Sequence, residues 1–225
     1  MRDQIAILTR PRSDAPGFSC VLADPPWPER GGGKIKRGAD RHYELMSVCD
    51  IIKMPVASIC APDAHCWMWV TNNYLPDGLR AMSAWGFRYI SNVAWGKVSS
   101  KTGLAQIGMG QYLRGSHELL LFGVRGKMPP AHRGAGIDAR TYCTLQLHER
   151  TKHSRKPDTF YDLIEAVSGD VPRIELFGRR VRDGWIAMGN DPSLDELGGL
   201  SMDVPKGINE LAHNRELLRD FTSRR

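Results

Sequence analysis

The sequence lacks both a hydrophobic run of membrane-spanning length and a paired-cysteine pattern. Its 225 residues include five cysteines, an odd number, and no two of them form a Cys-x-x-Cys pair. A disulfide framework and a structural zinc site are therefore not expected, and we predict no metal site. No apolar run approaches the roughly 18 residues of a transmembrane helix, and the N-terminus lacks a signal-peptide pattern. We therefore expect an intracellular, cytoplasmic protein with no membrane partner.

The usual glycine-rich nucleotide-binding patterns are also missing. No Gly-x-Gly-x-x-Gly follows a strand-like run, so a standard dinucleotide-binding fold is not indicated. The segment Gly31-Gly32-Gly33-Lys34 lacks the Ser or Thr and the spaced first glycine of a phosphate loop, which argues against nucleotide hydrolysis. A net charge of +6 is compatible with a polyanionic partner, although many basic proteins bind no nucleic acid. The positions of the charges are therefore more informative than their sum.

The basic side chains concentrate in three segments between apolar runs, which favours loops. Solvated surface loops are the alternative interpretation for any one segment, but three together favour a face that contacts phosphates. The nucleic-acid-binding candidates are Lys34, Lys36, Arg37, Arg41, His42, Arg133, Arg150 and Lys152.

Short apolar runs of strand length alternate with helix-like periodicity. The strand-like runs cover residues 18–23, 65–70, 87–95, 118–124, 141–147, 174–177 and 185–188. Apolar residues three or four apart predict a helix over 73–86, and a second helix is expected over 158–168, after a proline and before a glycine. This alternation predicts an α/β fold with a mostly parallel central sheet flanked by helices.

The chain is expected to form one domain, because it contains neither an internal repeat nor a domain-sized linker. Residues 1–17 are polar and contain prolines, which predicts a flexible lead-in. Residues 18–192 are the expected catalytic domain. Residues 193–225 are expected to form a C-terminal tail with a helix after Pro205.

The segment Asp24-Pro25-Pro26-Trp27 directly follows the first strand-like run. In open α/β sheets, ligands bind beyond the carboxyl ends of the strands, so we expect these four residues in a ligand crevice. Their chemistry suits methylation of the exocyclic amine of adenine. The lone pair of that nitrogen is delocalised into the ring, so acceptors for both of its N–H groups are needed to draw it toward tetrahedral geometry. The Asp24 carboxylate can accept one N–H and the Pro25 carbonyl the other, in a backbone fixed by the prolines.

The same segment offers Trp27 as a flat face on which the target base can stack. A methyl donor must then lie in line behind the transferred methyl group, so positioning and electrostatics supply most of the rate. We therefore predict that Asp24, Pro25, Pro26 and Trp27 form the catalytic site. The alternative is a strand-ending turn that is capped by prolines and closed by an aromatic side chain.

This motif and the order of the segments around it resemble the MT-A70 family of adenine-N6 methyltransferases over most of the chain. The resemblance implies a Rossmann-like methyltransferase fold and S-adenosyl-L-methionine as the cofactor. The matching segments are 24–27, 43–47, 67–71, 115–118, 154–158, 175–179 and 185–190.

The resemblance also implies which residues bind the donor. Lys156 is expected to pair with its methionine carboxylate, with a surface lysine before a helix as the alternative. Glu175 and Arg179 are expected at the ribose, with a strand-end ion pair as the alternative. Tyr43 is expected to close over donor and base, or else to be a core aromatic. Asn190 is expected near the adenosyl group, or else to lie in a turn. The full set is Asp24, Tyr43, Lys156, Glu175, Phe177, Arg179 and Asn190.

Three stretches depart from the family pattern, and all three concern donor binding. The family often has an acidic residue well upstream of its catalytic motif, and neither Asp3 nor Asp14 aligns clearly with it. The stretch 180–184 reads Arg-Val-Arg-Asp-Gly where a His/Asn contact to the ribose is common. Asp191 stands where an amide is common.

The sequence predicts a site-specific enzyme that methylates the N6 amine of adenine in DNA. A base in a duplex must be flipped out of the stack for this chemistry, and phosphate contacts from basic loops would help to offset that cost. DNA is favoured because the chain carries no separate RNA-binding module such as a zinc finger. The alternatives are methylation of RNA and a catalytically inactive, nucleic-acid-binding partner subunit. The oligomeric state stays open, with a homodimer as one alternative.

Overall fold

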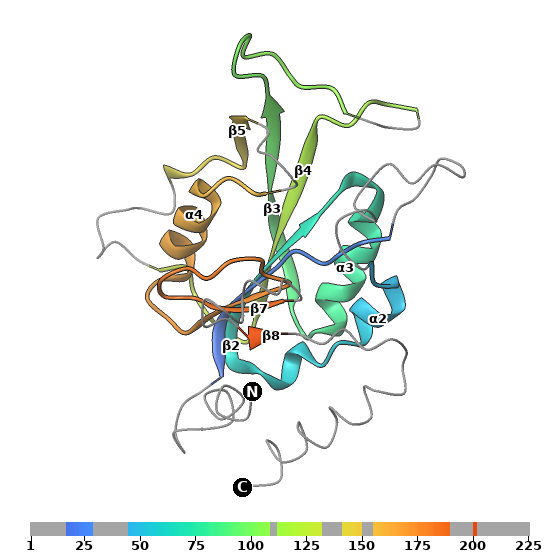
Figure 1. Cartoon of the computed structure of the whole chain (residues 1–225). Coiled ribbons are helices and arrows are strands. Elements are labelled where there is room, and N and C mark those ends of the chain that lie inside the picture. Colours follow the sequence, from blue (N-terminus) through green and yellow to red (C-terminus); the bar gives the residue numbers. More distant parts are fainter. Residues whose placement is uncertain are drawn as a thin grey trace, which may run out of the picture.

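A computed structural model of the chain gives its fold. The structure describes residues 17–28, 45–108, 112–131, 141–149, 155–189 and the backbone of 200–201 (Figure 1). Helices cover both faces of one twisted sheet. The helix predicted after Pro205 lies outside the described residues.

In the described part of the chain, eight strands form a single sheet in the order β5-β3-β4-β2-β1-β6-β7-β8. Every neighbouring pair is parallel except the two pairs that β4 makes with β2 and β3. The predicted α/β fold with a mostly parallel sheet is therefore confirmed. The strands are β1 Phe18–Ala23, β2 Cys60–Val70, β3 Arg88–Val98, β4 His117–Arg125, β5 Leu145–Glu149, β6 Arg173–Leu176, β7 Ile186–Gly189 and β8 Leu200–Ser201.

Helix α4 (Thr159–Ser168) covers one face of the sheet, and α2 (Val48–Lys53) and α3 (Leu75–Ala84) cover the other (Figure 1). The two helices expected from periodicity are confirmed as α3 and α4. Gly86 and Gly169, just beyond these helices, have φ of 86° and 78°, a conformation that glycine adopts at little cost. The sequence did not predict α2, because six residues are too few to show a helical period. The described residues also form two short 3₁₀ turns, η2 (Val56–Ser58) and η3 (Asn72–Tyr74).

The central strands are apolar on both faces because each face is buried under a different helical layer. In β1, Val21 and Ala23 join the core beneath α2 and α3, while Cys20 and Leu22 join the core beneath α4. Alternate residues of β2 divide between the same two cores. Strands buried on both faces read as continuous hydrophobic runs, which is why they were visible in the sequence.

Strand boundaries differ most from the predicted ones at the start of β2, which begins at Cys60 rather than at residue 65, and in the edge strand β5. The strand predicted at 141–147 is β5, which spans Leu145–Glu149 and pairs in parallel with β3. Leu145 and Leu147 of β5 are exposed, so the apolar pattern there marks an edge rather than a core strand. Strand β8 was not predicted. No helix in the part of the chain that the structure describes is long and apolar enough to cross a membrane.

Candidate active site

The candidate site lies at the edge of the sheet where the parallel strands end. Asp24 directly follows β1, and Glu175 of β6 is in register with Leu22 of β1. Because β4 runs antiparallel to its neighbours, its first residues lie at this edge rather than its last. Glu118 therefore joins Asp24 and Glu175 at one edge, although it stands at the start of a strand.

Asp24 is one end of an ion-pair network of four side chains: Asp24, Lys156, Glu118 and Lys97. Lys156 Nζ lies 2.9 Å from Oδ2 of Asp24 and 3.1 Å from Oε2 of Glu118. Lys97 Nζ lies 2.5 Å from Oε1 of Glu118. The two central members are the most buried, with Lys156 12% and Glu118 14% exposed. Two lysines balance two carboxylates, so the network is neutral as a whole.

The two central members keep their charges because each has two partners of opposite sign. Burial alone would raise the pKa of Glu118, but the ammonium groups of Lys156 and Lys97 hold it at about 2. Burial would lower the pKa of Lys156, but the Asp24 and Glu118 carboxylates raise it above its ordinary value. The network therefore presents fixed charges beside Asp24. Lys156 contacts Oδ2 of Asp24, and no described residue donates a hydrogen bond to Oδ1.

The backbone after Asp24 is held by hydrogen bonds to both proline carbonyls. The Pro25 carbonyl accepts from the backbone N–H of Trp27 at 2.8 Å, a three-residue turn, and the Pro26 carbonyl accepts from Met46 at 3.0 Å. A carbonyl oxygen has two lone pairs, so Pro25 retains one acceptor position. The Met46 contact therefore ties the segment before α2 to the Asp24–Trp27 segment. The next residue, Ser47, caps α2 by accepting a hydrogen bond from the backbone N–H of Asp50.

Trp27 occupies a different place from the one we predicted. Its ring is 9% exposed and stacks on Tyr74, with 5.3 Å between the ring centroids and 14° between the planes. Its Nε1 donates to the backbone carbonyl of Trp69 at 3.0 Å. A ring that is stacked and hydrogen-bonded within the core is not a platform open to a base. We therefore correct the expected stacking role: Trp27 is a packing residue that anchors the segment carrying Asp24.

Glu175 offers a second acceptor close to Asp24. Its side chain is buried, and Oε1 accepts from the Tyr161 hydroxyl at 2.8 Å. Among the described residues, Oε2 has no hydrogen-bond donor. Burial raises the pKa of Glu175 to about 7, which the Tyr161 hydrogen bond opposes and the nearby Asp24 carboxylate reinforces. A buried acceptor without a donor costs free energy, so this atom is suited to a ligand that brings one.

The chain leaves β6 through a strained and crowded turn. Phe177 has φ of 65°, a left-handed conformation that is rare for a non-glycine residue and is found at functional sites. A Cβ added to Gly189 would lie 1.9 Å from the Gly178 carbonyl oxygen, so the ends of β6 and β7 touch through backbone alone. These bare backbones beside the open Glu175 oxygen fit an adenosyl group, whose ribose hydroxyls are hydrogen-bond donors. The residues present therefore fit S-adenosyl-L-methionine.

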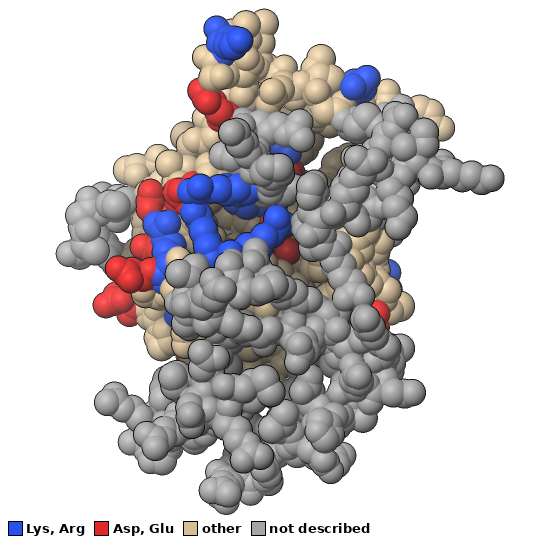
Figure 2. Space-filling model, viewed as in Figure 1, with Lys and Arg blue, Asp and Glu red and all other residues tan. Residues whose placement is uncertain are grey.

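The turn between β6 and β7 is attached to α4 by arginines. Arg180 forms an ion pair with Asp158, and Arg182 lies 3.4 Å from an oxygen of Asp162. The guanidinium groups of both arginines lie over the Tyr161 ring, at 5.4 and 4.6 Å from its centroid. Figure 2 shows Lys and Arg side chains gathered next to Asp and Glu side chains on this face. These arginines stand where the family often has a His/Asn contact to the ribose, and here they brace the turn.

The remaining predicted residues divide between exposed and undescribed positions. Arg179 is exposed, at the start of the turn that follows β6. Donor contacts by Phe177 and Arg179 stay predictions. The site candidates outside the described residues are Tyr43, Asn190, Lys34, Lys36, Arg37, Arg41, His42, Arg133, Arg150 and Lys152.

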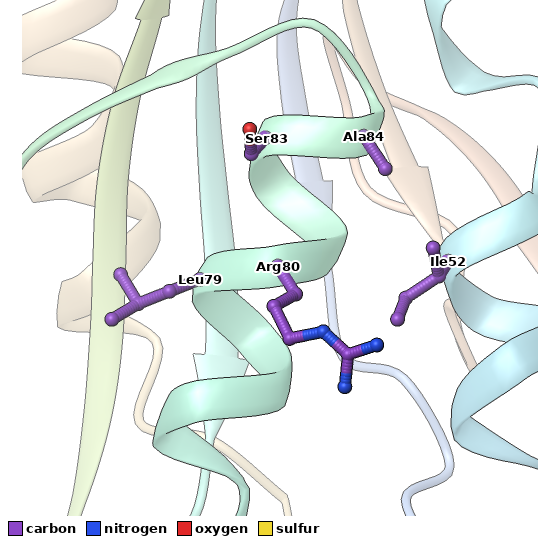
Figure 3. Close-up of a pocket in the computed structure, with 5 residues that line it drawn as sticks. All are labelled: Ile52, Leu79, Arg80, Ser83 and Ala84. Atoms are coloured by element: carbon purple, nitrogen blue, oxygen red, sulfur yellow. The ribbon is translucent and has the colours of Figure 1, made fainter.

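A separate hollow between α2 and α3, of about 470 Å³, lies away from this chemistry (Figure 3). It is lined by Ile52, Leu79, Arg80, Ser83 and Ala84, and Figure 3 shows the Arg80 side chain extending toward α2. Arg80 is paired with Asp77 one helical turn earlier. None of these five lining residues carries a carboxylate, so the hollow lacks the kind of group that Asp24 supplies at the candidate site.

Sequence reasoning missed Glu118, Lys97 and Tyr161. Glu118 carried a signal, because a carboxylate at the start of the apolar run HELLLF is expensive to bury without a partner. Its place at the candidate site was hidden because a wholly parallel sheet would put the start of the strand at the opposite edge. Lys97 and Tyr161 carry no comparable signal, since a lysine in a strand and a tyrosine in an amphipathic helix are ordinary.

The chain is similar in sequence to known proteins over most of its length. The family model described as MT-A70 matches residues 18–191. The human N(6)-adenosine-methyltransferase catalytic subunit METTL3 is 30% identical over 193 residues, which cover 83% of this chain and 30% of that protein. The zebrafish METTL3 subunit is 31% identical over 198 residues, covering 85% and 30%. The N6-methyladenosine RNA methyltransferase MTA1 of Cryphonectria parasitica is 26% identical over 187 residues, covering 80% and 53%. The chain thus spans less than two thirds of the length of these relatives.

Proposed function

Because the chain belongs to the MT-A70 family, we propose that it transfers a methyl group from S-adenosyl-L-methionine to the N6 amine of adenine in RNA. The observation that carries the proposal is the Asp24 carboxylate at the end of β1. Lys156 holds one of its oxygens, and no donor among the described residues occupies the other. Such an oxygen can accept a hydrogen bond from the amine of a target base.

The chain's own groups can prepare that amine for reaction. Oδ1 of Asp24 accepts one N–H of the base, and the remaining lone pair of the Pro25 carbonyl accepts the other. Two acceptors on one nitrogen draw its lone pair out of conjugation with the ring. The fixed ammonium of Lys156 holds the carboxylate in place, so little reorganisation accompanies the reaction. Asp24 or solvent takes the amine proton after methylation, when that proton has become acidic.

Other residues at the same edge fit the donor. When bound, the donor supplies a methyl group on a positively charged sulfonium. Oε2 of Glu175 would accept a ribose hydroxyl, beside the glycine contact between β6 and β7. Lys156 has three N–H donors and uses two on Asp24 and Glu118, so the third would be left to donate to the methionine carboxylate. Each carboxylate near the donor also favours its sulfonium electrostatically.

The names of the related proteins favour RNA as the substrate. The names of the METTL3 relatives specify N(6)-adenosine, and the name of MTA1 specifies RNA. The sequence alone favoured DNA on the absence of a separate RNA-binding module, and none of these relatives supports that preference. Methylation of RNA, the alternative weighed at that point, is therefore our main proposal.

The direct test presents both nucleic acids to the same protein. Methyl-labelled donor is incubated with single-stranded RNA and with DNA of matched sequence, and the products are digested to nucleosides and identified. We expect labelled N6-methyladenosine from RNA and none with Asp24→Asn. Label in N6-methyldeoxyadenosine alone would restore the DNA interpretation. Label on another base would contradict the proposed chemistry.

A non-catalytic partner subunit is the second candidate, and donor binding separates it from the first. Calorimetry with S-adenosyl-L-methionine should show binding at one site that weakens in Glu175→Gln. A subunit that only supports an active partner should show no binding. The intact Asp24, Lys156 and Glu175 arrangement supports the catalytic candidate.

A further inference from the structure

We propose that Lys97 is a positioning residue for methyl transfer: it holds Glu118, and Glu118 holds the Lys156 ammonium against Asp24. Lys97 lies on β3, two strands away from β2 and three from β1, which leads into Asp24. Its effect on the reaction is therefore indirect. This inference rests on the function proposed above for Asp24.

Each ammonium group in the network sits between a carboxylate and an aromatic ring. Nζ of Lys156 lies 5.3 Å from the centroid of Trp69, and Nζ of Lys97 lies 4.8 Å from that of Trp95. The two rings meet edge to face at 6.1 Å, and Trp95 Nε1 is fixed by the His148 carbonyl at 3.2 Å. Both lysines thus have a defined location, which a solvated surface pair would lack.

The charge balance explains why Glu118 needs a second lysine. Without Lys97, the single ammonium of Lys156 would face two carboxylates, and the network would carry a net negative charge. Lys156 lies 2.9 Å from Asp24 and 3.1 Å from Glu118, so it is shared nearly equally. Removing the other partner of Glu118 would draw Lys156 toward Glu118 and release the Asp24 oxygen that it fixes. Misplacing a reacting group by about 1 Å can cost on the order of 100-fold in rate.

The test uses Lys97→Met, which keeps much of the aliphatic stem and removes the charge. We expect kcat for methyl transfer to RNA to fall about 10- to 100-fold, with the KM for RNA changed less than about 3-fold. The acidic limb of the rate profile should move to higher pH, because Glu118 loses a cation that holds its pKa low. Lys97→Arg should restore much of the rate by returning the positive charge. Lys101→Met, an exposed lysine in the turn after β3, is the matched control and should match the native protein.

A second readout does not depend on activity. Carboxyl carbon NMR should show Glu118 titrating at higher pH in Lys97→Met than in the native protein. If the native protein transfers no methyl group but this shift occurs, the proposed function fails while the coupling of Lys97 to Glu118 stands. An unchanged Glu118 titration overturns the inference. It is also overturned by an unchanged kcat with a raised KM for RNA and a flatter salt dependence, because Lys97 would then be a phosphate contact.

Discussion

Asp24 follows the end of one strand and Glu118 stands at the start of another, yet both carboxylates contact the same ammonium group. Lys156 reaches Oδ2 of Asp24 at 2.9 Å and Oε2 of Glu118 at 3.1 Å. The contact is possible because β4 is antiparallel within an otherwise parallel sheet. The reversed strand brings a carboxylate to the edge where the other strands end, so the residue after β1 acquires a fixed electrostatic partner.

Asp24→Asn should abolish the transfer while the fold persists. The amide keeps the size of the carboxylate but removes its charge, so it accepts the N–H of the target amine more weakly and holds Lys156 less well. We expect the rate to fall at least about 100-fold, as when one preorganised polar group is removed from an active site. Transfer of labelled methyl to RNA measures the rate.

The control is Asp170→Asn, a fully exposed aspartate in the loop after α4 that pairs with Arg173 at the start of β6. It makes the same chemical change outside the site and should leave the rate unaltered. Circular dichroism of both variants should match the native protein. Native-like transfer by Asp24→Asn would refute the role assigned to this carboxylate.

The sheet and its main helices could be predicted because their signals are local. Strands such as β1 and β2 are buried on both faces and therefore read as continuous apolar runs, and α3 and α4 show helical spacing. The candidate carboxylate Asp24 was identified because it directly follows such a run. In contrast, α2 is too short to show a period, and β8 has two residues.

The partners of Asp24 depend on topology, which the sequence does not reveal. Glu118 is 94 positions from Asp24 along the chain, and only the reversed direction of β4 brings the two together. Lys156 was identified, but its contacts with two protein carboxylates were not. The role of Trp27 also depends on residues distant in the sequence. An aromatic residue next to a catalytic carboxylate suggests stacking on the base, but in the structure its ring packs on Tyr74 and donates a hydrogen bond to the Trp69 carbonyl.

Glu175 should make the stability of the protein fall as pH rises. Its pKa of about 7 in the folded chain exceeds the ordinary value of 4.5, so the folded state binds the proton more tightly. The stabilisation is complete below about pH 4.5 and is lost as pH rises through about 7. A shift of this size corresponds to about 3 kcal/mol. Urea unfolding of the native protein and Glu175→Gln across this range measures the difference.

Relative to Glu175→Gln, the native protein should lose stability between pH 4.5 and 7. Comparing the pH dependence of the two proteins removes the constant cost of burying the amide. Glu149→Gln, which changes an exposed carboxylate on β5, should follow the native curve. Parallel curves for Glu175→Gln and the native protein would show that Glu175 does not titrate here.

Gly189→Ala should destabilise the junction between β6 and β7. The new Cβ would lie 1.9 Å from the Gly178 carbonyl oxygen, which is far inside van der Waals contact. Because that oxygen is a backbone atom, the backbone must move. We expect a loss of about 3 kcal/mol or more in the free energy of unfolding, at or above the usual range for overpacking. Donor affinity should fall as well, because the displaced turn carries Phe177. Urea unfolding and calorimetry provide the two measurements.

Gly96→Ala on β3 is the matched control. Its Cβ would meet the Cδ2 atom of Leu147 at 2.6 Å, but that side chain is 59% exposed and can rotate away. The free energy of unfolding should change by less than about 1 kcal/mol, since alanine also offsets the entropic cost of glycine in a strand. Equal losses in the two variants would mean that the β6–β7 contact is not a special constraint.

Two substitutions of Trp27 distinguish a packing role of its ring from a role in stacking on the target base. Trp27→Phe keeps an aromatic face against Tyr74 but removes the Nε1 hydrogen bond to the Trp69 carbonyl, so we expect a loss of about 1 kcal/mol in stability. Trp27→Ala also leaves a cavity in the core and should cost about 3–5 kcal/mol. If the ring were instead a platform for the base, Trp27→Ala would raise the KM for RNA and leave stability nearly unchanged. Urea unfolding and steady-state kinetics on the same preparations distinguish these outcomes, because a buried anchor must appear first in the free energy of unfolding.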